Sequence, residues 1–119
     1  MKQTKLCPIF CLKKGVEIDD FSEMIDWSYN HSCSNTVLIL TEDEVKYYQE
    51  EGLWEIISKE TGNWLFGLYE DDWIFDFDTM KNIIKSINES NIKIDRNINK
   101  ILFILNYAIS NEKSVIFYL

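Results

Sequence analysis

Four aspartates in the middle of the chain are the residues whose type and spacing could perform chemistry. Asp76 and Asp78 form an Asp-x-Asp pair, and Asp71 and Asp72 lie just before them. Two carboxylates on one face of a strand can hold Mg²⁺, so these four residues could serve a small metal-dependent enzyme. The chain has only four glycines and no glycine-rich loop to hold a phosphate. We therefore interpret Asp78 as a helix cap and Asp76 as a solvated side chain, and the enzyme remains an alternative.

The single histidine and the three cysteines give no better candidate for catalysis. His31 could act as a general base, but no nucleophile motif accompanies it, and a cation also suits the end of a helix. Cys7, Cys11 and Cys33 lack the paired spacing of a zinc site, and an odd, low cysteine count predicts reduced thiols. We expect no enzyme, no metal and no cofactor. No run of 18 apolar residues is present, so we also expect no membrane span and a cytoplasmic location.

The elements that position these residues alternate between strands and helices. Short apolar or β-branched stretches predict five strands, at Lys5–Leu12, Thr36–Leu40, Asn63–Tyr69, Trp73–Phe77 and Ser114–Leu119. Pro8 lacks an amide donor, which predicts an edge or the start of a strand, whereas Thr36–Leu40 is typical of a central strand. Trp73–Phe77 and the strand before it predict a hairpin.

Apolar residues at helical spacing predict the helices. The predicted helices run from Asp19 to Asn30, around Met80–Ile87 with Asp78 or Thr79 as the cap, and over Asn97–Ser110. The segment from Thr41 to about Glu60, with a break at Gly52, is either one kinked helix or two short ones. Asp20 with Glu23, and Thr41 with Glu44, are spaced as capping boxes. The order β-α-β-α-ββ-αα-β predicts an α/β or α+β fold, in which helices cover a mixed sheet of about five strands. We expect residues 1–119 to form a single globular domain.

Negative charge is concentrated in one part of the chain. Residues 16–80 contain 17 of the 20 Asp and Glu residues but only two cations, Lys46 and Lys59, against a net charge of −8 for the whole chain. Such a field attracts basic partners and repels nucleic acid. Within the first predicted helix, Asp19, Glu23 and Asp26 lie opposite the apolar face and form an acidic stripe.

This profile of small size, concentrated acidity and no enzyme motif resembles the immunity proteins of bacterial toxin systems, including those of contact-dependent growth inhibition. The apolar helix from Lys100 and the terminal strand Ser114–Leu119 are also loosely similar to the barstar-like inhibitors. The resemblance implies a protein that binds a cognate toxin, usually a basic nuclease, and blocks its active site.

The predicted contact residues follow from this interpretation. Carboxylates would occupy a basic cleft with fast, salt-sensitive association, and nearby aromatic residues would be buried anchors. The predicted partner-binding residues are Asp19, Glu23, Asp26, Trp27, Tyr69, Glu70, Asp71 and Asp72. Besides the protein toxin we expect no nucleic-acid partner and no membrane. A further alternative is an acidic nucleic-acid mimic of the phage type, which blocks a DNA-binding protein.

Overall fold

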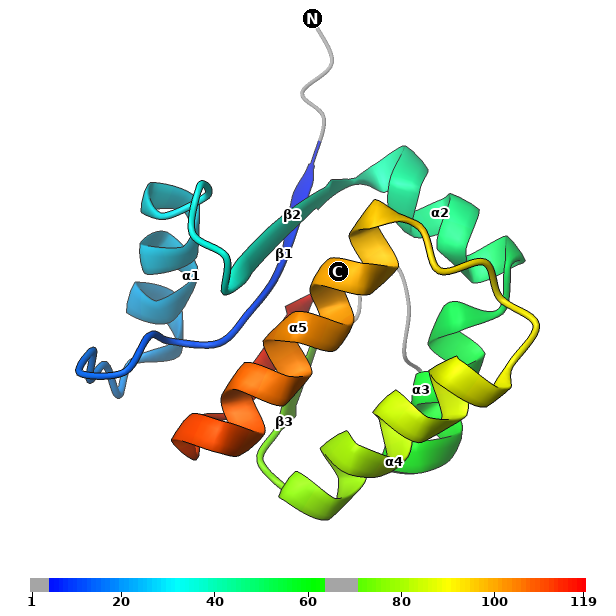
Figure 1. The fold of residues 1–119 in the computed structure, drawn as a ribbon. Coiled ribbons are helices and arrows are strands. Elements are labelled where there is room, and N and C mark those ends of the chain that lie inside the picture. Colours follow the sequence, from blue (N-terminus) through cyan, green and yellow to red (C-terminus); the bar gives the residue numbers. More distant parts are fainter. Residues whose placement is uncertain (1–4, 64–70) are drawn as a thin grey trace, which may run out of the picture.

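The computed structural model describes residues 5–63 and 71–119, in which helices pack against a small sheet (Figure 1). The described strands form a sheet of order β2-β1-β4-β3, with β1 (Leu6–Phe10), β2 (Val37–Thr41), β3 (Asp71–Ile74) and β4 (Val115–Tyr118). The described helices are α1 (Phe21–Asn30), α2 (Glu42–Glu50), α3 (Leu53–Thr61), α4 (Phe77–Glu89) and α5 (Arg96–Asn111). The predicted combination of helices with a sheet is confirmed. The sheet has four strands in the described part rather than about five, and its pairings are antiparallel rather than mixed.

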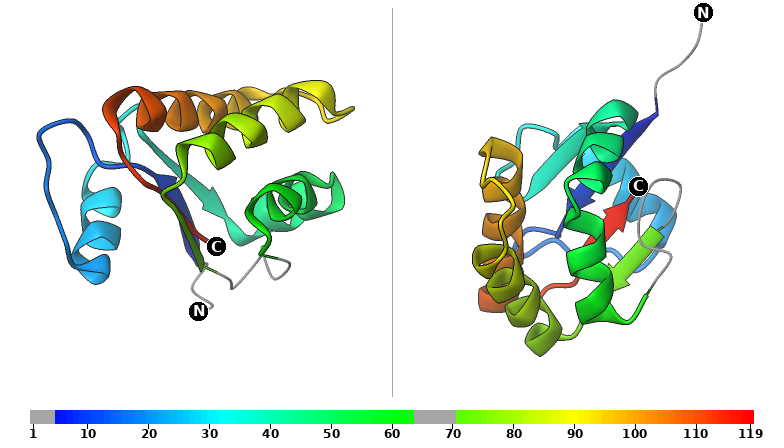
Figure 2. Two further views of the ribbon diagram at one scale, coloured as in Figure 1. Left: turned by 90° about the horizontal axis from the view of Figure 1, so that it is seen from below. Right: turned by 90° about the vertical axis from the view of Figure 1, so that its right-hand side faces the viewer.

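The helices are divided unequally between the two faces of the sheet. Figure 2 shows α1 by itself on one side of the strands, with the other helices on the opposite side. Alternate strand residues produce this division, because successive side chains point to opposite faces. Ile9 and Phe117 belong to the core under α2–α5, whereas Phe10, Val37 and Ile116 pack toward α1. None of the helices in the described residues is long and apolar enough to cross a membrane.

The strand β1 lies inside the sheet, so the prediction that Pro8 marks an edge or a strand start is wrong. Pro8 is buried in the middle of β1 and lies opposite Ile39 of β2. On its other side β1 pairs with β4 only through Ile9 and Phe10. The missing amide is tolerated because Pro8 lies just beyond the end of this second ladder.

The strand β2 occupies an edge of the sheet and not the predicted centre. It pairs with β1 alone, yet Val37, Leu38 and Leu40 are buried. Helices cover both of its faces, which explains the continuous apolar run that the sequence shows.

The capping signals after β2 are confirmed in detail. The Thr41 side chain accepts from the Glu44 amide (3.2 Å), and the Glu44 carboxylate accepts from the Thr41 amide (3.0 Å). Gly52 has φ 88°, a left-handed conformation that favours glycine, and it separates α2 from α3. Of the two open alternatives, one kinked helix or two short ones, the structure has two.

The segment between α3 and α4 differs most from expectation. Most of the predicted strand Asn63–Tyr69 lies outside the described residues, so the predicted hairpin lies outside them as well. The strand β3 ends at Ile74 and pairs with β4, while Phe77 already belongs to α4. The predicted strand Trp73–Phe77 is therefore too long at its C-terminal end. Asp76 ends the strand early because its side chain starts the helix.

Candidate functional site

The helix α1 presents the predicted acidic stripe to solvent. Asp20 caps the helix by accepting from the Glu23 amide (3.0 Å), and Met24, Ile25 and Ser28 are buried against the sheet. A helix with this inward face has its opposite side in water, and Asp19, Glu23 and Asp26 are all exposed. The predicted geometry is thus confirmed for Glu23 and Asp26. Asp19 lies before the N-cap Asp20 and so outside α1, because the helix begins at Phe21 and not at the predicted Asp19. The role of all three in binding stays a prediction.

The far end of α1 is fixed to the sheet by aromatic contacts. Trp27 is half-buried, lies 6.2 Å from Phe10 between ring centroids, and stacks on His31 at 4.5 Å. His31 Nδ1 lies 2.8 Å from the Trp27 carbonyl oxygen, so the ring donates back to its own helix. Tyr29 Oη donates to the Leu6 carbonyl oxygen (2.9 Å), and burial raises the pKa of this phenol. These contacts support the interpretation of His31 as a structural residue, and they hold the acidic stripe on a rigid element.

The other predicted contact residues lie on or before β3. Tyr69 and Glu70 are outside the described residues. Asp71 is exposed at the start of the strand. Asp72 is half-buried, and its carboxylate accepts from its neighbour's amide, that of Trp73 (2.8 Å), and from Asn63 Nδ2 (3.3 Å). Asp71 is thus the freer of the two carboxylates for an external contact.

The Asp-x-Asp pair serves the helix α4. Asp76, rather than the predicted Asp78 or Thr79, is the N-cap, and it accepts from the Asp78 amide (3.2 Å) and the Thr79 hydroxyl (2.8 Å). Asp78 is exposed in the first turn, so the predicted roles of the two aspartates are exchanged. Within the described ranges, no three His, Cys, Asp or Glu side chains lie close enough together to hold a metal ion.

A second acidic surface lies on α2 and α3, and the list of predicted contact residues omits it. Its exposed members are Asp43, Glu50, Glu51 and Glu55. The signal was present in the sequence as part of the acidic stretch 16–80. These helices lie across the sheet from α1, so the structure divides one acidic stretch of sequence between two separate surfaces (Figure 2).

Comparisons with known proteins give the arrangement a family. The family model described as DMP12, DNA-mimic protein, matches residues 5–119. The DNA mimic protein DMP12 of Neisseria meningitidis serogroup B is 42% identical over 110 residues, which are 92% of this chain and 93% of that protein. A solved structure of the Neisseria DNA mimic protein DMP12 superposes with a TM-score of 0.87 at 39% identity, and the match covers 97% of this chain and 100% of that one.

These findings correct the interpretation drawn from the resemblance. The matching family and the matched Neisseria protein are described as DNA mimics, so the predictions of an immunity protein, of a role in contact-dependent growth inhibition and of a cognate toxin partner are wrong. The expectation of no nucleic-acid partner needs correction too, because DNA is the molecule that the matched protein is named for imitating. The alternative of an acidic nucleic-acid mimic is the prediction that these findings support. The error has a physical reason, because an inhibitor of a basic nuclease and a mimic of DNA both need carboxylates facing a basic surface.

Proposed function

This chain belongs to the DMP12 family of DNA-mimic proteins, and we propose that it binds a DNA-binding protein. The proposed contact is the surface with which the partner binds DNA. The observation that carries the proposal is the acidic stripe at α1, in which Glu23 and Asp26 are exposed on a helix anchored to the sheet and Asp19 is exposed just before its N-cap. Such carboxylates are held in place, as phosphates are along a duplex.

The spacing of the stripe suits this role. Side chains three or four residues apart on a helix have Cβ atoms about 5–6 Å apart, so Glu23 and Asp26 are neighbours on α1. Asp19, just before the N-cap, adds a third exposed carboxylate at the start of the helix. A duplex carries one negative charge per roughly 1.7 Å of its axis, and the proteins that bind it line their surfaces with Lys and Arg. A partner built for the duplex is therefore attracted to the stripe at long range, and its association depends on salt.

We place the contact on α1 and on the start of β3, where Asp71 adds a carboxylate. The acidic surface of α2 and α3 is the competing position, on the other side of the sheet. The α1 side is favoured because the sheet face beneath it carries the exposed edges of large side chains, which can become buried anchors. Trp73 of β3 is half-buried on this face, and so is Phe21 in the first turn of α1, whose ring centroid lies 5.9 Å from that of Trp73.

The proposed activity is binding without catalysis. Asp76 is engaged by the first turn of α4 and Asp72 by its neighbours, which leaves these aspartates as structural acceptors. A mimic acts by occupying a site, and this requires no bond to be made or broken. We propose a cytoplasmic location as well, because DNA-binding proteins of a bacterial cell are found with its DNA.

Charge reversal on each acidic surface tests the proposal. The heparin-binding proteins of the source cell are first passed over resin that carries the immobilised chain. A partner that is retained is then eluted with a short DNA duplex. The test variant combines Asp19→Lys, Glu23→Lys and Asp26→Lys, and the matched control combines Glu50→Lys, Glu51→Lys and Glu55→Lys. Both variants change the net charge equally, and both retain Asp20, the N-cap of α1.

The proposal predicts that the α1 variant loses affinity for the partner at low salt and that the control keeps most of it. Thermal melting of both variants shows whether the fold is intact. Equal effects of the two variants would show that only net charge matters, and loss in the control alone would move the contact to α2 and α3. If the duplex elutes no protein from the resin, the proposed function is wrong.

A further inference from the structure

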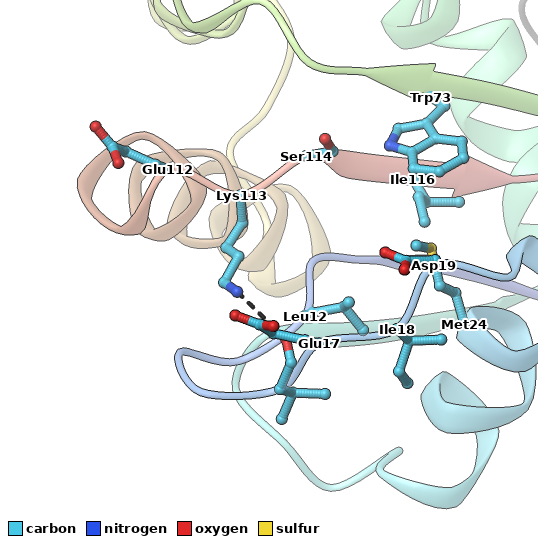
Figure 3. Close-up of a pocket in the computed structure, with 11 residues that line it drawn as sticks. Leu12, Glu17, Ile18, Asp19, Met24, Trp73, Glu112, Lys113, Ser114 and Ile116 are labelled. Atoms are coloured by element: carbon cyan, nitrogen blue, oxygen red, sulfur yellow. Dashed lines mark hydrogen bonds between the residues drawn. The ribbon is translucent and has the colours of Figure 1, made fainter.

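A hollow of about 300 Å³ lies beside the acidic stripe, at the N-terminal end of α1 (Figure 3). One wall is the loop between β1 and α1, and the opposite wall is the connection from α5 to β4. Trp73 of β3 and Ile116 of β4 line the end of the hollow that is closed by the sheet. The hollow is thus formed by three parts of the chain that are far apart in sequence.

The inner part of the hollow is apolar. Ile116 and Met24 are buried, Ile18 is half-buried, and all three line the space. If an alkyl chain lay on these side chains, water would be removed from the apolar surface of the ligand and from that of the hollow, which favours binding. The inner part therefore suits an unbranched hydrocarbon stem.

The rim of the hollow is negatively charged. Glu17, Asp19 and Glu112 line it and are exposed. Lys113 is the cation among the lining residues, and its Nζ donates to the Val16 carbonyl oxygen (3.3 Å), which ties one wall to the other. Three carboxylates against one ammonium group favour a cationic ligand over an anionic one.

The indole of Trp73 adds a hydrogen-bond donor without an acceptor. Its Nε1 is buried and has no partner among the described residues, although buried N–H groups are almost always paired. The nitrogen edge of the ring is turned toward the side on which Ser114 lies (Figure 3). A carbonyl oxygen is the kind of group that would complete its hydrogen bonding, and because the nitrogen is closed to water in this structure, such a group reaches it only if the wall beside it shifts on binding.

We propose that this hollow binds a basic peptide segment, with one arginine or lysine side chain lying in it. The alkyl stem packs on Met24 and Ile116, and the charged head reaches the carboxylates of Glu17 and Asp19. A peptide segment also supplies carbonyl oxygens, which an isolated cation does not. The proposal rests on the proposed function for its source, since the segment belongs to the DNA-binding partner. It extends the mimicry from the phosphates to the groove, where DNA-binding proteins insert arginine.

The test needs no partner and so separates this proposal from the proposed function. N-acetyl-arginine amide is titrated into ¹⁵N-labelled protein, and the indole N–H signals of the assigned tryptophans are followed by NMR. N-acetyl-citrulline amide, which has nearly the same shape without the charge, is the matched ligand. The proposal predicts a saturable shift of the Trp73 indole signal with arginine, and binding of citrulline weaker by about tenfold or more.

Variants on the rim complete the test. Glu17→Gln with Asp19→Asn should weaken arginine binding several-fold, while the equally neutralising pair Glu50→Gln with Glu55→Gln on the other acidic surface should leave it unchanged. The proposal is overturned if Trp73 shows no saturable shift, if citrulline binds as well as arginine, or if both pairs act alike. If arginine binds the hollow but the DNA duplex elutes no captured protein, the proposed function alone is refuted. Partner binding through α1 without an arginine site would refute the hollow alone.

Discussion

Replacement of Glu112 by glycine should stabilise the fold, because Glu112 ends α5 in an unfavourable backbone conformation. Its φ of 55° and ψ of 48° are left-handed, and it is the one non-glycine residue with positive φ in the described part of the chain. The conformation is needed there because it lets the Lys113 amide donate to the Ala108 carbonyl oxygen (2.8 Å) and close the helix.

The expected gain follows from two opposing terms. A left-handed conformation costs an L-residue about 1–2 kcal/mol, and glycine removes this cost. Glycine also makes the unfolded chain more flexible, which subtracts about 0.4–1 kcal/mol. The net effect of Glu112→Gly is a rise of roughly 0.5–1 kcal/mol in the free energy of unfolding, or about 2–5 °C in Tm for a domain of this size.

The assay is urea unfolding followed by tryptophan fluorescence, with Glu112→Gln as the matched control. Glutamine keeps the strained backbone and removes only the negative charge beside the carbonyl end of the helix, so the difference between the two variants isolates the backbone term. If glycine is no more stable than glutamine, the reasoning about this cap is refuted. Both variants remove a carboxylate from the rim of the hollow and should weaken arginine binding. Glu112 would then be a residue that lowers the stability of the fold but strengthens binding.

Three smaller predictions concern the supporting structure. Thr41→Ala breaks the capping box of α2 and should lower the free energy of unfolding by about 1 kcal/mol in urea titration; no loss would contradict the cap. Tyr48 Oη donates to Asp95 (2.6 Å), and burial, followed by this bond, raises the pKa of the phenol. The contribution of this phenol to the free energy of unfolding should therefore be fully present below about pH 10 and decline as the pH rises above it. In urea titrations at increasing pH, Tyr48→Phe should show a smaller decline than the wild type. Cys33 is exposed and should react quickly with a thiol reagent near pH 8, whereas Cys11, whose pKa burial raises to about 12, should react only on unfolding.

The features of the fold that depend on neighbouring residues were predictable from the sequence. The caps Asp20 and Thr41 and the break at Gly52 are all in place, because each depends on residues within one helical turn. The cap of α4 was misplaced because Asp76 and Asp78 are both good capping residues, and only the end of β3 selects the first. The strand order depends on pairing between distant segments, so the position of Pro8 in an inner strand had no local signal.

The candidate site was predictable in part for the same reason. Helical spacing was sufficient to place Glu23 and Asp26 on an exposed face, whereas Asp19 is exposed but lies before the helix begins. The target was misidentified because an acidic stripe suits any basic surface, whether it belongs to a nuclease or to a nucleic-acid-binding protein. The hollow could not be foreseen, since Met24, Trp73 and Glu112 come together only through the pairing of β3 with β4 and the closing turn of α5.

Mutual exclusion between this protein and DNA on one partner tests the central claim most directly. A fluorescent DNA duplex is bound to the captured DNA-binding protein, and its anisotropy is followed while this protein is added. The account predicts that the duplex is fully released, and that its apparent Kd rises in proportion to the concentration of added protein without reaching a limit. An apparent Kd that levels off, or a complex that holds both the duplex and this protein, would show that the protein binds elsewhere and does not mimic DNA.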